Sequence, residues 1–135
     1  MILNKNKKKV ILIYFTVAVL LHIYKVIICK FNINDFISIN KTKSLIFNGW
    51  TISHLILNAI VGYIFPNEIY ISIILGIIWE IYEYIYSLNF PILINLYKHI
   101  CKNSPEKIIL YNPYDFIINI IGILIGKYLS FISSR

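Results

Sequence analysis

The chain has 135 residues, of which 59% are hydrophobic, and its mean hydropathy is +0.73. A soluble domain of this size could not bury so much apolar surface, whereas a bilayer can accommodate it. The formal net charge of +7 comes from basic residues that lie at the ends of apolar runs, where they would meet lipid headgroups. This placement argues against nucleic acid as a partner. The sequence therefore predicts a single transmembrane helical domain over residues 1–135, with membrane lipids as its partners.

The first apolar run covers residues 10–29 and follows the basic segment NKNKKK at 4–9. This order is similar to that of a signal peptide, but the run is too long and no small-residue cleavage site follows it. The pattern predicts a retained transmembrane helix. Lys25 lies one turn from the end of this helix, and we expect its side chain to extend to the headgroups.

The second and third transmembrane helices are predicted at residues 45–65 and 68–87. Pro66-Asn67 separates them. Such a short turn makes the two helices antiparallel neighbours in the bundle.

The last connection contains a second apolar stretch, residues 91–101, which is too short to span a bilayer and predicts a short interfacial helix. The fourth transmembrane helix is expected at 113–133. The predicted fold is therefore an all-α, polytopic four-transmembrane-helix bundle with both termini on one side, which the lysines at the start of the chain indicate to be cytoplasmic. Cys29 and Cys101 fall on the other side, where the pattern favours free thiols unless that compartment is oxidising.

Polar and small residues interrupt three of these apolar helices at steps of three or four residues, so that they share one face of each helix. Lipid cannot satisfy polar groups, and such a face must meet other protein. The second helix carries Trp50, His54, Asn58 and Gly62, the third carries Gly76, Glu80 and Glu83, and the fourth carries Asp115, Asn119, Gly122 and Gly126.

The depth of these residues in the membrane indicates whether they can meet. At about 1.5 Å of rise per residue, His54 lies about 13 Å from the side that carries the two long connections. Glu80 and Glu83 lie about 10 and 6 Å from that side, and Asp115 and Asn119 about 3 and 9 Å from it. All five are in the same half of the membrane. We therefore expect one polar site that opens toward the long connections.

A histidine with carboxylates could bind a divalent metal or act as a general acid–base pair. Unpaired carboxylates in an apolar run cost several kcal/mol, which makes Glu80 and Glu83 difficult to explain by packing alone. No serine or cysteine nucleophile with an evident base and no zinc-type cysteine spacing is present. The catalytic candidates are His54, Glu80, Glu83 and Asp115, the substrate-binding candidates are Trp50, Asn58 and Asn119, and the metal candidates are His54, Glu80 and Asp115.

Several of these residues also have a purely structural interpretation. Asp115 can cap the last helix and interact with its dipole, and Asn58 and Asn119 can form interhelical hydrogen bonds. Gly122 and Gly126 form a GxxxG motif, which is typical of closely packed helices. If all polar residues act in this way, the chain is a non-catalytic structural or assembly membrane protein.

The pattern resembles that of the VanZ-like membrane proteins. The likeness covers residues 49–129 and consists of His54 in the second helix, WEIYE in the third, and D-x-x-x-N-x-x-G-x-x-x-G in the fourth. The resemblance implies a multi-pass membrane protein but supplies no biochemical mechanism. Our hypothesis for a polar site inside a membrane is that it binds or modifies a lipid-like or envelope-associated substrate.

The chain departs from the family pattern at two positions. The family usually has Glu-x-x-Gln in the third helix, whereas this chain has Glu80-x-x-Glu83, a version that is similar to a related group of bacterial membrane proteins. The family's Arg shortly before the Asp is absent, because residues 111–114 read YNPY. The missing Arg weakens the expectation of an anionic substrate.

Overall fold

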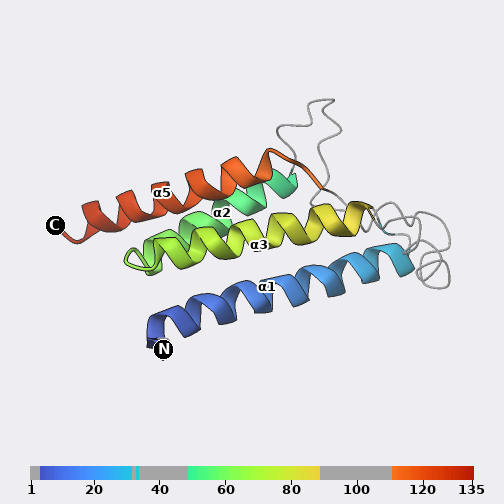
Figure 1. Ribbon diagram of the computed structural model, residues 1–135, viewed down its shortest axis with the longest axis horizontal. Helices are drawn as coiled ribbons and strands as arrows, with labels where there is room; N and C mark the ends of the chain where they lie inside the picture. Colours follow the sequence, from blue (N-terminus) through green and yellow to red (C-terminus); the bar gives the residue numbers. More distant parts are fainter. Residues whose placement is uncertain (1–3, 32, 34–48, 89–110) are drawn as a thin grey trace.

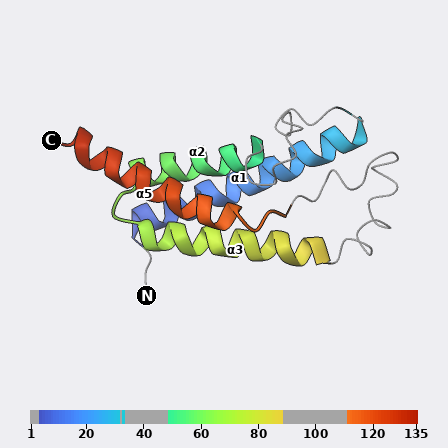
Figure 2. The same ribbon diagram turned by 90° about the horizontal axis from the view of Figure 1, so that it is seen from above.

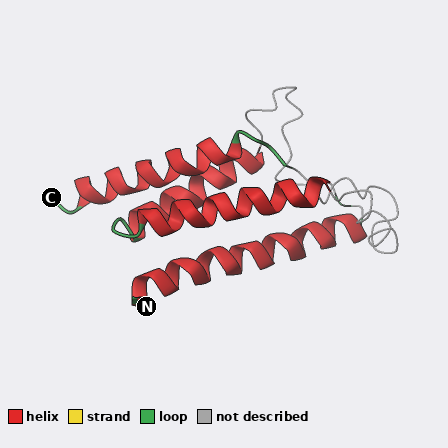
Figure 3. Cartoon of the chain, in the orientation of Figure 1, coloured by secondary structure: helices red, strands yellow, loops and turns green. Residues whose placement is uncertain are grey.

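The chain folds as an elongated bundle of helices that lie side by side in the computed structural model (Figures 1 and 2). The structure describes residues 4–31, 33, 49–88 and 111–135, and within these residues it contains only helices, turns and loops (Figure 3). The helices are α1 (Lys5–Lys30), α2 (Gly49–Ile64), α3 (Ile69–Leu88) and α5 (Asp115–Ser133). The all-helical prediction is confirmed, whereas the interfacial helix predicted at 91–101 lies outside the described residues.

Three of the helices, α1, α3 and α5, are long and apolar enough to cross a membrane. Their outer faces carry many exposed large hydrophobic side chains, such as Ile78 and Leu124, which are 55% and 52% exposed. Such surfaces are stable in contact with lipid and not with water. The chain therefore has the features of a membrane protein. The described part of α2 has 16 residues and is shorter than the other three helices.

The helix ends differ from the predicted ones for local reasons. α1 begins at Lys5 instead of residue 10, because the Asn4 side chain accepts a hydrogen bond from the Lys7 backbone at 2.8 Å and caps the helix ahead of the apolar run. α5 begins at Asp115, two residues later than expected. There, Asn112 forms a turn in which its side chain accepts from the backbone of Tyr114 at 3.2 Å.

Glycines bring α2 and α5 into backbone contact, as the GxxxG spacing predicts. A Cβ atom on Gly122 would lie 2.6 Å from the carbonyl oxygen of Leu55, and one on Gly126 would overlap the carbonyl oxygen of Ala59. Gly62 on α2 meets the backbone of α5 in the same way. Any larger residue at these positions would force the two helices apart.

The ends of the bundle differ in character. The start of α1, the C-terminus and the turn between α2 and α3 lie at one end of the bundle, and the last residues of α1 and α3 lie toward the other end, as do the first residues of α2 and α5 (Figure 1). Cys29, near that second end, is buried and disulfide-bonded, so the expectation of a free thiol is wrong for this residue.

Candidate functional site

Asn119 lies on the second turn of α5 and joins three helices through its side-chain amide. Its Nδ2 donates to Oε1 of Glu80 on α3 at 2.7 Å, and its Oδ1 accepts from Nδ2 of Asn58 on α2 at 2.7 Å. Nδ1 of His54 lies 3.0 Å from the same Oδ1. The hydroxyl of Tyr14 extends the network to α1 by donating to Oδ1 of Asn58. Residues from all four described helices thus share one chain of hydrogen bonds.

The direction of every bond in this network follows from one backbone carbonyl. Nδ2 of Asn58 also donates to the carbonyl oxygen of His54 at 2.8 Å, and a carbonyl can only accept. This bond fixes the orientation of Asn58 and therefore that of Asn119. Because Oδ1 of Asn119 is an acceptor, Nδ1 of His54 must donate to it. The neutral His54 ring therefore keeps an unshared electron pair on Nε2.

Glu80 and Glu83 lie on the same side of α3 next to this histidine. Glu80 is 6% exposed, and its Oε1 lies 3.7 Å from Nδ1 of His54. The Oε2 atoms of both glutamates are buried and have no hydrogen-bond partner among the described residues. One donor atom from each of His54, Glu80 and Glu83 lies within 4.8 Å of the others. We call these three residues the triad.

Asp115 is held slightly apart from the triad at the start of α5. Its Oδ1 accepts from the Thr51 hydroxyl at 2.8 Å and from Nδ2 of Asn112 at 3.0 Å, and the residue is 2% exposed. These bonds fit the structural interpretation of Asp115 as a residue that orders the beginning of its helix. In the triad, Glu83 occupies the place that the sequence led us to expect for Asp115.

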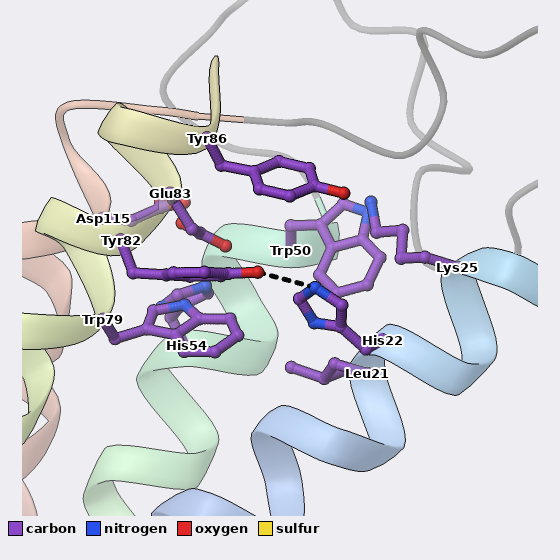
Figure 4. A pocket seen from close by; sticks show the side chains of 10 residues that line it. All are labelled: Leu21, His22, Lys25, Trp50, His54, Trp79, Tyr82, Glu83, Tyr86 and Asp115. Carbon is purple, nitrogen blue, oxygen red and sulfur yellow. Dashed lines mark hydrogen bonds between the residues drawn. The ribbon is translucent and has the colours of Figure 1, made fainter. Parts of the chain in front are cut away.

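A cavity opens beside the triad between α1, α2 and α3, and we call it the polar cavity (Figure 4). Its wall includes Glu83, His54 and Asp115 together with several aromatic residues. Nζ of Lys25 lies 3.8 Å from the centre of the Trp50 ring, so this lysine contacts the bundle instead of extending to the headgroups. The expectation for Lys25 was therefore wrong, because the Trp50 ring offers the ammonium group a cation–π contact.

Two further side chains of the polar cavity wall are hydrogen-bonded to each other. The hydroxyl of Tyr82 on α3 is 2.7 Å from Nε2 of His22 on α1 (Figure 4). The two rings are also tilted against each other, with centroids 5.7 Å apart. This pair links α1 to α3 at the level of the triad.

A second cavity, the apolar cavity, adjoins the first along α1. The two cavities share Leu21, His54 and Trp79 in their walls. The remaining wall of the apolar cavity combines hydrophobic residues, such as Val17, Ala18 and Leu57, with the uncharged network residues Tyr14, Asn58 and Asn119. A cavity lined by charged side chains and a cavity without any therefore meet at His54.

No family model, curated protein or solved structure matches this chain. The description of the site accordingly depends on its own geometry.

The structure brings together the residues that the sequence singled out, since His54, Asn58, Glu80 and Asn119 are all in one hydrogen-bonded cluster. Asp115, Glu83 and Trp50 line the adjoining polar cavity.

Sequence reasoning missed the contributions of Tyr14, Thr51 and Lys25. The spacing contains a signal for each of them. Tyr14 and Lys25 are eleven residues apart, which is three helical turns and puts them on the same face. Thr51 precedes Asn58 by seven residues and shares its face in the same way.

Proposed function

We propose that this chain is a VanZ-like integral membrane protein that binds, and acts on, a lipid-like amphipathic molecule at the triad. The junction of the polar and apolar cavities at His54 carries this proposal. A molecule with a polar headgroup and an acyl chain matches such a junction, because each part finds a compartment of its own polarity. The likeness to VanZ-like proteins rests on His54 and on the Asp115, Asn119, Gly122 and Gly126 pattern of the last helix.

The residues of the site suggest distinct roles. His54 with Glu80 or Glu83 supplies either a general base and its acid partner or ligands for a metal ion, because the electron pair on Nε2 serves only one of these roles at a time. Asn119 and Asn58 keep the histidine ring in one orientation. Lys25 supplies a positive charge beside the polar cavity, which would favour an anionic headgroup although the family's Arg is absent.

The membrane arrangement proposed with this function has four spans. α2 packs along α5, and α5 is long enough to cross the membrane. We therefore propose that α2 crosses the membrane beside α5. The termini would then lie on the same side, and the polar cavity would open toward the opposite side. We propose that the side with the termini is cytoplasmic, because of the lysines at residues 5–9.

A structural or assembly role is the alternative, and one observation favours it. The Asn119 network joins α2, α3 and α5 and would stabilise the bundle without any substrate. This role leaves the buried, unpartnered oxygens of Glu80 and Glu83 unexplained. A protein selected for stability alone would gain by replacing them with apolar residues.

Lipid photo-crosslinking in nanodiscs tests the proposal. The probe is a phospholipid with a diazirine in its acyl chain, and the labelled residues are mapped by mass spectrometry. We expect labelling of the apolar cavity near Val17 and Leu57. Ala18→Phe, which fills this cavity with a ring, should reduce the labelling there several-fold. Val19→Phe is the matched control, since Val19 is 42% exposed on the outside of the same turn and its substitution leaves the cavity open.

Equal labelling of the cavity residues in the Ala18→Phe and Val19→Phe variants would contradict the proposal. Labelling that is confined to outward-facing residues, such as Ile78 and Leu124, would also contradict it. Either result would favour the structural role.

A further inference from the structure

We infer that His54, Glu80 and Glu83 bind one divalent transition-metal ion, of the class of Zn²⁺ or Mn²⁺. The inference deepens the function proposed above and rests on the same site. It does not require that a lipid be bound.

The first argument is the state of the histidine. Metal-binding histidines commonly donate a hydrogen bond from one ring nitrogen to an oxygen and coordinate the ion with the other nitrogen. His54 has this arrangement, because Nδ1 donates to Asn119 and Nε2 keeps its electron pair. Asn119 is itself held by Asn58 and Glu80, so the ring orientation is fixed before any ion arrives.

The second argument is the state of the carboxylates. Oε1 of Glu80 is used by Asn119, but its Oε2 and that of Glu83 are buried and have no partner within the described part of the chain. Glu80 is more than nine-tenths buried. A buried carboxylate oxygen without a partner is costly in an apolar environment. A divalent ion would give both Oε2 atoms a partner.

The third argument is the spacing and chemistry of the donor atoms. One ring nitrogen of His54 and one carboxylate oxygen of each glutamate lie within 4.8 Å of one another, and donors around a tetrahedral zinc ion are about 3.4 Å apart. Binding of an ion therefore requires side-chain rotations that bring Nε2 of His54 and the two carboxylates to this spacing. One imidazole with two carboxylates suits Zn²⁺, Mn²⁺ or Fe²⁺, whereas Ca²⁺ requires six or more oxygen ligands.

The geometry favours Glu83 over Asp115 as the third ligand. Oδ1 of Asp115 already accepts hydrogen bonds from Thr51 and Asn112. Moving this oxygen to an ion would break both bonds at the start of α5, and Asp115 is not in the group of residues whose donor atoms lie within 4.8 Å of one another. Asp115 therefore orders the helix end beside the site, and Glu83 completes the set of ligands.

Metal titration of the full-length protein in mild detergent tests the inference. Protein stripped with a chelator is titrated with Zn²⁺ or Mn²⁺ alone, and bound metal is counted by mass spectrometry after gel filtration. We expect one ion per chain. Glu80→Gln and Glu83→Gln should each weaken metal binding at least ~10-fold. Loss of a residue that only hydrogen-bonds to a ligand already weakens binding by about this factor, and loss of a ligand itself should weaken it at least as much.

Two control variants separate the triad from other carboxylates. Glu68→Gln removes a carboxylate that is 7% exposed and lies outside the triad, where it accepts from Asn4 at 3.0 Å, and it should bind metal as the wild type does. Asp115→Asn should also keep the ion. Loss of binding in Asp115→Asn, with binding unchanged in Glu83→Gln, would overturn the assignment of Glu83.

The inference fails if the stripped wild type, still monodisperse, takes up neither Zn²⁺ nor Mn²⁺, or if the Glu80→Gln, Glu83→Gln and Glu68→Gln variants all bind one ion with unchanged affinity. The lipid crosslinking described above is performed on the same samples. Lipid labelling without metal would reject this inference alone. Metal binding without lipid labelling would reject the proposed substrate class and leave the metal site.

Discussion

At the scale of single residues, Asn119 determines the chemistry of the site more than any titratable group does. Its amide accepts on one side and donates on the other, so it orients the His54 ring and occupies one oxygen of Glu80. An aspartate of the same shape could not donate to Glu80 and would add a negative charge beside it. The neutral amide is therefore the residue that allows a histidine and a carboxylate to lie together in this interior.

We predict that Asn119→Ala lowers the free energy of unfolding far more than Tyr14→Phe does. Tyr14→Phe removes one interhelical hydrogen bond and should cost about 0.6 kcal/mol. Asn119→Ala leaves polar atoms of His54, Asn58 and Glu80 without their partner, at about 1–3 kcal/mol for each buried group. Steric trapping in bicelles measures both values. If the two variants lower the free energy of unfolding equally, water or rearranged side chains must replace the hydrogen bonds that Asn119 makes.

The sequence predicted the members of the site because a polar residue in an apolar helix is conspicuous and must turn inward. Counting residues along the helices also predicted correctly that these polar residues lie in the half of the bundle where α2 and α5 begin. It did not reveal that Glu83, instead of Asp115, joins His54 and Glu80, since axial depth does not specify the rotation of each helix about its axis. Rotation depends on packing, and here glycines that touch backbone atoms set it.

At the scale of helices, α2 and α5 are the most closely packed pair, and the other two helices contact them mainly through side chains. Gly62, Gly122 and Gly126 allow this approach. The sequence contained the motif, and it predicted all four helices to within a few residues where the structure describes their ends. It missed the start of α1, because a polar cap at Asn4 extends the helix through lysines that carry no hydrophobic signal.

We predict opposite effects of glycine-to-alanine substitutions at two positions. A methyl group at Gly126 would overlap the backbone of Ala59, and separating α2 from α5 should cost about 1–3 kcal/mol. A methyl group at Gly76 would lie 3.7 Å from Cβ of Asn119, which is an ordinary contact. Gly76→Ala should therefore be neutral or stabilise α3 by up to about 1 kcal/mol, because alanine loses less backbone entropy.

Thermal unfolding in detergent, followed by the loss of the monodisperse fraction, compares the two variants. We expect the midpoint temperature of Gly76→Ala to equal or exceed that of the wild type, and the midpoint temperature of Gly126→Ala to be lower than that of the wild type. If Gly126→Ala were as stable as the wild type, α2 and α5 would not be in backbone contact.

At the scale of the whole molecule, α1 forms the outer wall of both cavities. It contributes Tyr14, Leu21 and Lys25 to their linings, yet the apolar window of this helix is only 6% buried. α2, α3 and α5 position the triad and its hydrogen-bonded neighbours, and α1 closes the two cavities from the remaining side.

The path of α2 across the membrane follows from its contacts with α5. Its 16 described residues correspond to about 24 Å, somewhat less than the ~30 Å hydrocarbon core. The glycine contacts nevertheless hold α2 along α5, which has 19 residues and is apolar enough to cross. A helix that shares the axis of a spanning neighbour is expected to cross with it, and the bilayer can thin locally to match its length.

We therefore predict that the turn between α2 and α3 and the C-terminus lie on the same, cytoplasmic side. Green fluorescent protein, which fluoresces only in the cytoplasm, and alkaline phosphatase, which is active only after export, are fused after Asn67 and after Arg135. Both green fluorescent protein fusions should fluoresce, and both phosphatase fusions should be inactive. If phosphatase is active after Asn67 but not after Arg135, α3 and α5 do not both cross. The two fusion points share a side whenever α3 and α5 cross, so an N-terminal epitope tag, probed with protease on intact cells, reports on α2. The tag and Asn67 should lie on the same side; if they lie on opposite sides, α2 does not cross and the triad cannot lie inside a four-span bundle. If the tag and both fusion points are all outside, the four spans stand but the orientation is inverted, and the polar cavity opens to the cytoplasm.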